Sequence, residues 1–481
     1  MENKETFHRS LSLLDATLLV IGSMIGSGIF IVGADMTRNV GSAGWLIAVW
    51  VITGIMTITA AVSYGELSGM YPKAGGQYVY LREAYNPLVG FLYGWSFFSV
   101  IQTATIAAVA IAFAKFSGYF FPVLNLTNDN ILFTLGPVTV YPAHLLAIGV
   151  IILLTYVNSR GVKEGKTIQL VFTFSKMLAL FGLVVFGFIL VDHSFFAENW
   201  SNAFNAAQDL GTKDETGRLI PSGWTAIGGP ALMGAIAAAM VGSVFSSDAW
   251  NNVTFVAGEV KNPQRNIGLS LFLGTFIVTL LYITTNLMYL NVLPLTQVAF
   301  PEEDRLAVAA ANQVFGANGK FAIAALIMIS TFGCNNGLIL AGARVYYTMA
   351  KDGLFFNKAG NLNKNGVPQW ALWAQCVVAS ALCLSGRYGD LLDMISFVVV
   401  IFYVLTIAGI FILRKKKPDA ERPYKAFGYP LLPALYIVMG ISFCVLLIWF
   451  KPAFTWPGFI IVLIGIPIFY ALKKRGITTT E

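Results

Sequence analysis

The residues best suited to bind a small molecule form a glycine- and serine-rich stretch, Gly22-Ser23-Met24-Ile25-Gly26-Ser27-Gly28. The stretch lies inside an apolar run over residues 11–32, yet it holds three glycines and two serines in seven positions. We expect the helix in this run to break near its middle. An open turn in hydrocarbon leaves amide and carbonyl groups unpaired, so it persists only where it lines a cavity or meets a ligand.

Such a break would present main-chain groups of opposite polarity. Where the helix restarts, the amides of Gly26, Ser27 and Gly28 would be free donors at a helix N-terminus, which suits an anion. The preceding half-helix would end in free carbonyls around Met24 and Ile25, and carbonyl oxygens suit an ammonium group. Donors for a carboxylate beside acceptors for an amine are what the backbone of an α-amino acid requires.

A second polar stretch, Phe245-Ser246-Ser247-Asp248, interrupts the apolar run over residues 231–257 in the same way. Free carbonyls around Phe245 would add acceptors for the amine. Phe245 could close over the site as a gate, or it could simply pack in the core. Asp248 could attract a cationic side chain or the substrate ammonium, or it could cap the helix that restarts after the break.

One basic residue, Lys176, lies about ten residues into the apolar run over 167–191. At about 1.5 Å per residue this places it roughly mid-membrane, where an unpaired charge is costly. Its ammonium could donate to the carbonyls of the first break, in the place of a sodium ion. It could also titrate and carry a proton, or it could be a structural lysine satisfied by carbonyls.

Two other interpretations of the first stretch explain less of the sequence. Gly22 and Gly26 have the small-xxx-small spacing of closely packed membrane helices, but packing alone does not explain a second break. A dinucleotide-binding G-x-G-x-x-G loop is excluded because the third glycine position is Ile31 and no strand precedes the stretch.

The composition requires that these residues be held by membrane-spanning helices. The chain has 481 residues, of which 57% are apolar and 11% are charged, and its mean hydropathy is +0.71. Soluble domains have about 25% charged residues. We therefore predict an all-α polytopic membrane protein that forms a single domain over residues 1–481.

Apolar runs predict twelve transmembrane helices, each about 20 residues long. Their approximate ranges are 11–32, 44–68, 88–118, 141–157, 167–191, 231–257, 268–290, 320–347, 370–385, 391–413, 431–450 and 456–472. Of the 31 Lys and Arg residues, 22 lie at the termini or in the connections that share their side. By the positive-inside rule this side is cytoplasmic, so we predict a multi-pass protein of the plasma or inner membrane with both termini in the cytoplasm and no removable signal peptide.

The two broken helices are five spans apart, and an odd number of spans inverts the second half relative to the first. We therefore predict an inverted repeat, with helices 1–5 over residues 11–191 and helices 6–10 over residues 231–413. Helices 11 and 12, over 431–472, fall outside it. The net charge of +7 is explained by topology and anionic headgroups without nucleic acid.

Ordered motifs along the chain then give a family resemblance. They are Ile25-Gly26-Ser27-Gly28-Ile29-Phe30, Tyr64-Gly65-Glu66-Leu67 with Pro72, Gly75-Gly76, Tyr78, Tyr80-Leu81 and Gly94-Trp95, the segment Gln169 to Lys176, Phe245 to Asn251, Glu259 with Asn262-Pro263 and Arg265-Asn266, Arg344 with Met349-Ala350-Lys351-Asp352-Gly353, and Arg422-Pro423-Tyr424 with Pro430. In this order they cover essentially the whole chain. The chain resembles the amino acid–polyamine–organocation superfamily, and within it the bacterial relatives of the L-type amino acid transporters.

The resemblance implies a leucine-transporter-like fold of five-plus-five helices and sodium-independent exchange of L-amino acids by alternating access. It implies that Gly26, Ser27 and Gly28 hold the carboxylate and that the carbonyls of Met24, Phe245 and Asp248 hold the amine. It also implies that Phe245 gates the site and that Lys176 replaces the sodium site.

The chain departs from this family at two places. Animal members pair with a heavy subunit through a cysteine in the loop after helix 3, whereas residues 119–141 contain none, so we expect no disulfide-linked partner. Relatives often have Phe-Ala-Tyr where this chain has Phe245-Ser246-Ser247, which should alter the pocket and leaves the substrate side chain open. Neutral amino acids are the first expectation.

Three alternatives stay open from the sequence. A proton-coupled symporter or a carrier of cationic amino acids or polyamines would use the same site, and a non-transporting amino acid receptor would bind without flux. An enzyme is disfavoured because His8, His144 and His193 lie away from the site and no nucleophile–base pair is evident. We expect no cofactor and no metal, since the four cysteines lie in apolar runs without ligand spacing.

Overall fold

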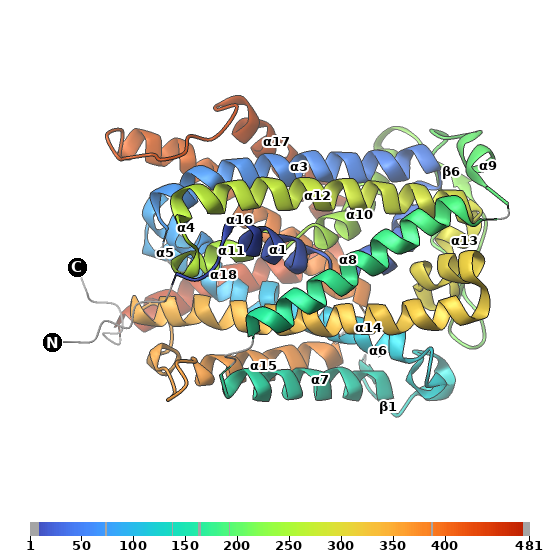
Figure 1. Cartoon of the computed structure of the whole chain (residues 1–481), viewed down its shortest axis with the longest axis horizontal. Helices are drawn as coiled ribbons and strands as arrows, with labels where there is room; N and C mark the ends of the chain where they lie inside the picture. The colour runs from blue at the N-terminus through green and yellow to red at the C-terminus, as the bar shows by residue number, and fades with distance from the viewer. Residues whose placement is uncertain are drawn as a thin grey trace.

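The structure, a computed structural model, describes residues 9–72, 75–136, 138–161, 165–191, 193–385 and 388–474. Long helices run side by side along the molecule (Figure 1). In chain order they are α1 (Leu13–Met24), α2 (Gly28–Val40), α3 (Ala43–Met70), α4 (Gln77–Ala84), α5 (Pro87–Ser96), α6 (Gln102–Ser117), α7 (Pro142–Ser159), α8 (Gly165–Ile189), α9 (Phe196–Trp200), α10 (Gly229–Ser246), α11 (Asn252–Phe255), α12 (Pro263–Val292), α13 (Leu295–Ala299), α14 (Leu306–Lys351), α15 (Gln369–Ser385), α16 (Tyr388–Lys416), α17 (Leu431–Phe450) and α18 (Pro452–Lys474).

The remaining elements are short. A π-helical turn, η1 (Phe97–Ile101), joins α5 to α6, and 3-10 turns occur at η2 (Pro122–Leu124), η3 (Asn128–Asn130), η4 (Ala257–Glu259), η5 (Glu302–Asp304) and η6 (Asn357–Gly360). Three antiparallel strand pairs lie in the connections: β1 (Phe133–Leu135) with β2 (Val138–Val140), β3 (Ala207–Gln208) with β6 (Thr225–Ala226), and β4 (Thr212–Lys213) with β5 (Leu219–Ile220).

The apolar helices confirm the polytopic membrane fold. Ten helical stretches of the described residues are long and apolar enough to cross a bilayer, and α1 with α2 forms an eleventh span that is bent by 44°. The predicted ninth helix is α15, whose 17 residues are fewer than the roughly 20 that a span needs. The count of twelve, the single domain and the division into two inverted halves therefore stay predictions.

Three predicted boundaries differ from the structure. The first span, predicted at 11–32, continues through α2 to Val40. The span predicted at 320–347 belongs to α14, which begins at Leu306 and kinks at Gly316, where the backbone is left-handed (φ 67°). The span predicted at 231–257 ends its regular helix at Ser246, and only the short α11 and η4 follow. Polar residues interrupt these apolar runs. Where the helix begins and ends in such a run depends on tertiary contacts, which hydropathy does not show.

Ion pairs support the predicted separation of the charged connections into two sides. One group, which we call the terminal side, contains Arg82–Asp352, Arg344–Glu259, Arg414–Glu66, Arg422–Glu66 and Lys417–Glu83. The other group, which we call the loop side, contains Arg38–Asp304, Lys115–Asp304, Arg218–Glu302, Arg218–Glu303 and Lys451–Asp393. Every pair joins residues that the sequence places on the same side. Residues 1–8 and 475–481 lie outside the described residues, as do Lys73, Lys163 and Arg387.

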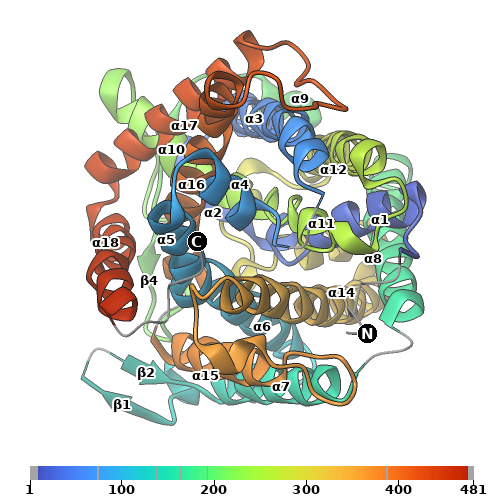
Figure 2. The same ribbon diagram turned by 90° about the vertical axis from the view of Figure 1, so that its left-hand side faces the viewer.

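Packing around α1 and α2 places the two polar stretches in the centre of the bundle. α12 runs along α3 and contacts α1, α10 packs against α2, and α14 packs against α6 and α8. Viewed from the terminal side, α1 and α11 lie between α12 and α14 (Figure 2). Met24, Ile25 and Phe245 all belong to the buried hydrophobic core.

Candidate functional site

The first helix breaks where the sequence predicts. A capping box begins α1, in which the Ser12 amide donates to Asp15 and the Asp15 amide donates to the Ser12 hydroxyl oxygen. The helix ends at Met24, and α2 begins at Gly28 after three linking residues. This break confirms the prediction of a discontinuous helix 1. Glycine and serine allow it because they tolerate an open turn better than branched apolar residues do.

Free donors are present at the start of α2, with one shift from the prediction. The amides of Ser27, Gly28 and Ile29 have no acceptor among the described residues. The Gly26 amide instead donates to the Met24 carbonyl at 2.8 Å, so it is not the free donor that the sequence suggested. The three amides at a helix N-terminus favour an anion such as a carboxylate.

The second polar stretch lies directly against the first. α10 ends at Ser246, and residues 247–251 are non-helical before the short α11. A Cβ atom added to Gly28 would lie only 2.1 Å from the Ser246 hydroxyl oxygen and 2.9 Å from its Cα. Glycine is therefore required at position 28 for the two breaks to meet this closely.

Lys176 joins the site from α8, as predicted. Its side chain is 2% exposed, and its ammonium donates to the carbonyls of Gly22 and Ile25, the latter at 2.7 Å. No carboxylate pairs with it among the described residues. The positive charge thus faces the C-terminal end of α1, where the helix dipole is negative and the last carbonyls lack intrahelical partners.

Tyr282, on α12, is a site residue that the sequence did not reveal. Its hydroxyl lies 2.9 Å from the Met24 carbonyl oxygen and 3.0 Å from the Ser246 carbonyl oxygen, so it bridges the ends of α1 and α10. The Met24 carbonyl already accepts bonds from Tyr282 and Gly26 in this structure. Accepting a substrate ammonium as well would require that it give up one of them.

A cavity of about 430 Å³ lies on the loop side of the site. Its lining includes Val241, Gly242, Leu392 and Tyr388. Beyond the cavity, the Tyr388 hydroxyl lies 3.1 Å from the Ser27 hydroxyl oxygen. Tyr388 thus lies between the cavity and the first break.

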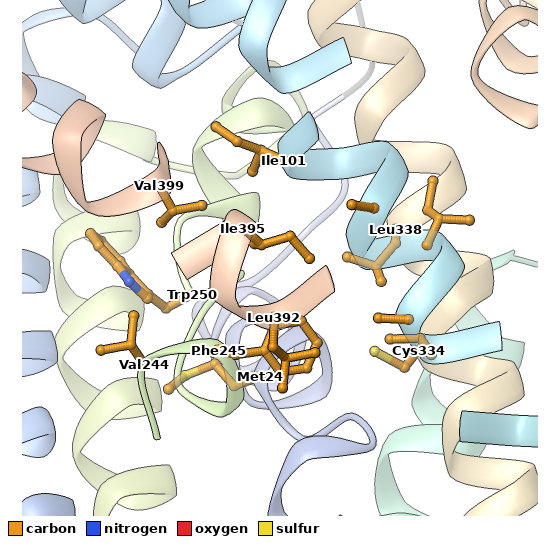
Figure 3. Packing of buried hydrophobic residues seen from close by; sticks show 14 of the residues in the cluster. Met24, Ile101, Val244, Phe245, Trp250, Cys334, Leu338, Leu392, Ile395 and Val399 are labelled. Carbon is orange, nitrogen blue, oxygen red and sulfur yellow. The ribbon is translucent and has the colours of Figure 1, made fainter. Parts of the chain in front are cut away.

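Phe245 completes this layer. Its ring meets that of Tyr388 edge to face, with centroids 6.0 Å apart. Figure 3 shows Phe245, Met24 and Leu392 close together, with Cys334 on the other side of the view. This position agrees with the gate that the sequence suggested, although the gating role itself stays a prediction.

Asp248 faces away from this layer. Its carboxylate accepts a hydrogen bond from the Tyr403 hydroxyl of α16, and no basic side chain pairs with it among the described residues. It borders two small cavities of about 20 Å³ each. The N-cap of α11 is Asn251, without a side-chain capping bond, so the alternative that Asp248 caps the restarting helix is wrong.

A backbone break with free amides beside the carbonyl end of α1 is the arrangement that the predicted amino acid site requires. Comparison with known proteins matches residues 11–469 to the family described as amino acid permease. The chain belongs to this family.

Relatives are similar over nearly the whole length of this amino acid permease. The large neutral amino acids transporter small subunit 2 of Mus musculus is 28% identical over 472 residues, which cover 96% of this chain and 80% of the relative. The Asc-type amino acid transporter 1 of Mus musculus is 28% identical and covers 96% and 81%. The b(0,+)-type amino acid transporter 1 of Mus musculus is 26% identical and covers 97% and 88%.

Proposed function

We propose that the chain exchanges L-amino acids across the membrane by alternating access, without sodium, and that neutral amino acids are its preferred substrates. The free amides of Ser27, Gly28 and Ile29 would bind the substrate carboxylate. The carbonyl of Asp248 would bind the ammonium, together with that of Met24 once Tyr282 or Gly26 releases it. The Phe245 carbonyl is not free as predicted, because it accepts from the Asp248 amide at 3.2 Å, and it would contribute only its second lone pair. Recognition by main-chain groups fixes the amino acid backbone and leaves the side chain to Ser246 and Ser247.

The contact of Lys176 with the Gly22 and Ile25 carbonyls is the observation that supports sodium independence. Carbonyl oxygens at the end of a half-helix are the groups that coordinate sodium in broken-helix transporters. An ammonium group that already occupies two of them supplies the positive charge that a bound sodium ion would otherwise bring. The family, and the neutral amino acids in the name of one relative, agree with this substrate class.

Exchange in proteoliposomes tests the proposal. Vesicles holding purified protein would be loaded with radiolabelled neutral amino acid in choline buffer, and efflux would be followed with and without unlabelled amino acid outside. We expect outside substrate to accelerate efflux and sodium to have no effect. Efflux that needs sodium, or that outside substrate does not accelerate, would contradict the proposal.

A second candidate function is a proton-coupled symporter or a carrier of cationic amino acids or polyamines. The unpaired carboxylate of Asp248 at the second break favours it, since a buried acid attracts a cationic group or a proton. Competition by arginine and putrescine against a neutral substrate, with and without a proton gradient, separates the two. Strong competition that Asp248→Asn abolishes would support the second candidate.

We further propose that the chain is not an enzyme, that it lies in the plasma or inner membrane with both termini in the cytoplasm, and that no heavy subunit is linked to it by a disulfide. The described cysteines are all free. A non-transporting receptor would bind amino acid but show no flux in the vesicle experiment. Labelling of a cysteine introduced near either terminus, in intact and opened cells, tests the orientation.

A further inference from the structure

The connection between α6 and α7 ends in the hairpin of β1 and β2. Phe133 pairs with Val140, Thr134 with Thr139 and Leu135 with Val138. Because directly opposed residues share a face and neighbours along a strand alternate, one face holds Phe133, Leu135, Val138 and Val140. The two threonines form the other face.

The apolar face of the hairpin is open on its first strand. Phe133 is 57% exposed and Leu135 is 75% exposed. A two-stranded hairpin is only marginally stable in water, and large apolar side chains on its uncovered face add to the cost of exposure. This face therefore requires an apolar cover.

Three observations identify the bilayer as that cover. The hairpin projects sideways beyond α7 and α15 when the bundle is viewed along its helices, so it overhangs the space beside the protein (Figure 2). Residues 119–141 contain Asp129 as their only charged residue. Apolar side chains are exposed again on α7, the next helix of the chain, where Leu145, Ile152 and Leu153 are 44–53% exposed.

Aromatic and aliphatic side chains precede the hairpin at the same end of the bundle. Phe121 and Val123, which follow α6, are 62% and 57% exposed. Aromatic residues are enriched at both membrane–water interfaces, and an apolar segment without charges partitions into the headgroup and acyl boundary.

We propose that the apolar face of the β1–β2 hairpin inserts into the bilayer interface on the loop side and anchors the connection between α6 and α7 to lipid. The occupant of this surface is the acyl and headgroup boundary of that leaflet. The anchor does not depend on which amino acid the protein moves, so transport and anchoring can be tested separately.

Fluorescence quenching on paired variants tests the proposal. Leu135→Cys on the apolar face and Thr134→Cys on the threonine face would each carry an NBD label in a Cys444→Ala background, because the other three cysteines are buried. Labelled protein in phosphatidylcholine nanodiscs would be exposed to iodide in the water or to lipids with a nitroxide on the acyl chain. Phe133→Cys provides a second position on the apolar face should Leu135→Cys fail to fold.

We expect the apolar-face labels to be quenched strongly by nitroxide lipid and weakly by iodide, and the Thr134 label to show the reverse. Equal iodide quenching at both faces would overturn the proposal, because the apolar face would then be in water. Protection from both quenchers would also overturn it and indicate a protein cover. Energy transfer between labelled copies in vesicles that disappears on dilution with unlabelled protein would identify that cover as a second copy.

Discussion

Replacing Lys176 by methionine removes the ammonium and keeps a side chain of similar length. The change leaves the buried carbonyls of Gly22 and Ile25 without these donors. Hydrogen bonds from a charged group contribute about 1.5–3 kcal/mol each, so two bonds give about 3–6 kcal/mol. Part of this is offset because a buried ammonium no longer has to be desolvated, which costs several kcal/mol.

A net loss of about 3 kcal/mol is the resulting estimate, and each 1.4 kcal/mol changes a rate by about tenfold. We therefore expect the rate of exchange to fall roughly 100-fold in Lys176→Met, because the end of α1 is no longer held in its binding arrangement. Initial rates of exchange in proteoliposomes measure this. Lys176→Gln separates the loss of the charge from the loss of the hydrogen bonds. It keeps a neutral donor, so it should recover part of the lost exchange rate.

Thr173→Val is the matched control. Thr173 lies one turn earlier on α8, is 1% exposed, and its hydroxyl has no partner among the described residues, so the nearly isosteric change removes no contact. It should keep the exchange rate of the unmodified protein. If Lys176→Met also exchanged within twofold of that rate, with the same folded fraction, the contact of Lys176 with α1 would have no part in transport and the reasoning would fail.

Three further substitutions follow from the geometry of the breaks. Gly28→Ala should abolish exchange, because the new methyl group would overlap Ser246. Adding Ser246→Gly to that variant should restore only part of the activity, since the backbone of residue 246 stays close to the methyl group. Tyr282→Phe should lower the free energy of unfolding by about 1–3 kcal/mol, as two buried carbonyls lose one donor, and thermal unfolding of the purified protein measures this. Phe245→Ala should raise efflux in the absence of outside substrate several-fold, because the ring no longer covers the site beside Tyr388; unchanged efflux would show that Phe245 is core packing alone.

The main-chain part of the site could be predicted because its signal is local. Gly22 to Gly28 and Lys176 are each unusual within an apolar run, and both lie where the prediction placed them. Their residue types alone conflict with a continuous span in hydrocarbon. A conflict of that kind identifies a functional position without any knowledge of neighbouring helices.

The side-chain part of the site could not be predicted in this way. Tyr282 and Tyr388 belong to helices in which a tyrosine is ordinary, because its ring suits the core and its hydroxyl needs only one partner. What distinguishes them is that α12 and α16 bring these hydroxyls to the breaks. Likewise the sequence left open whether Asp248 caps a helix. The helix that restarts is only four residues long, and the Asp248 carboxylate instead accepts a hydrogen bond from Tyr403.

The Asp304 carboxyl, which pairs with Lys115 and Arg38 on the loop side, is poorly suited to act as a pH switch. Burial alone would raise the pKa of Asp304, but the charges of Lys115 and Arg38 hold it well below its usual range. A carboxyl whose pKa is lower in the folded state stabilises the protein fully at pH values above its pKa in the unfolded state, which is about 3.9. This stabilisation is lost only as the pH falls below that value. Asp304 therefore stays charged near neutral pH, and a dependence of transport on pH in that range would have to arise from another group.

The site is closed by contacts of different kinds on its two sides. Toward the loop side, the cavity of about 430 Å³ reaches Tyr388, so one aromatic layer separates it from the first break. Toward the terminal side the adjoining cavities are about 20 Å³, and Asn251 donates to Gln77, which in turn donates to Thr406. Opening the terminal side requires separating α4, α16 and the segment after α10, whereas on the loop side the contact of Tyr388 with Phe245 lies between the cavity and the first break. Substrate should therefore enter this arrangement from the loop side, and the step that breaks the contacts of Gln77 should be the slower of the two.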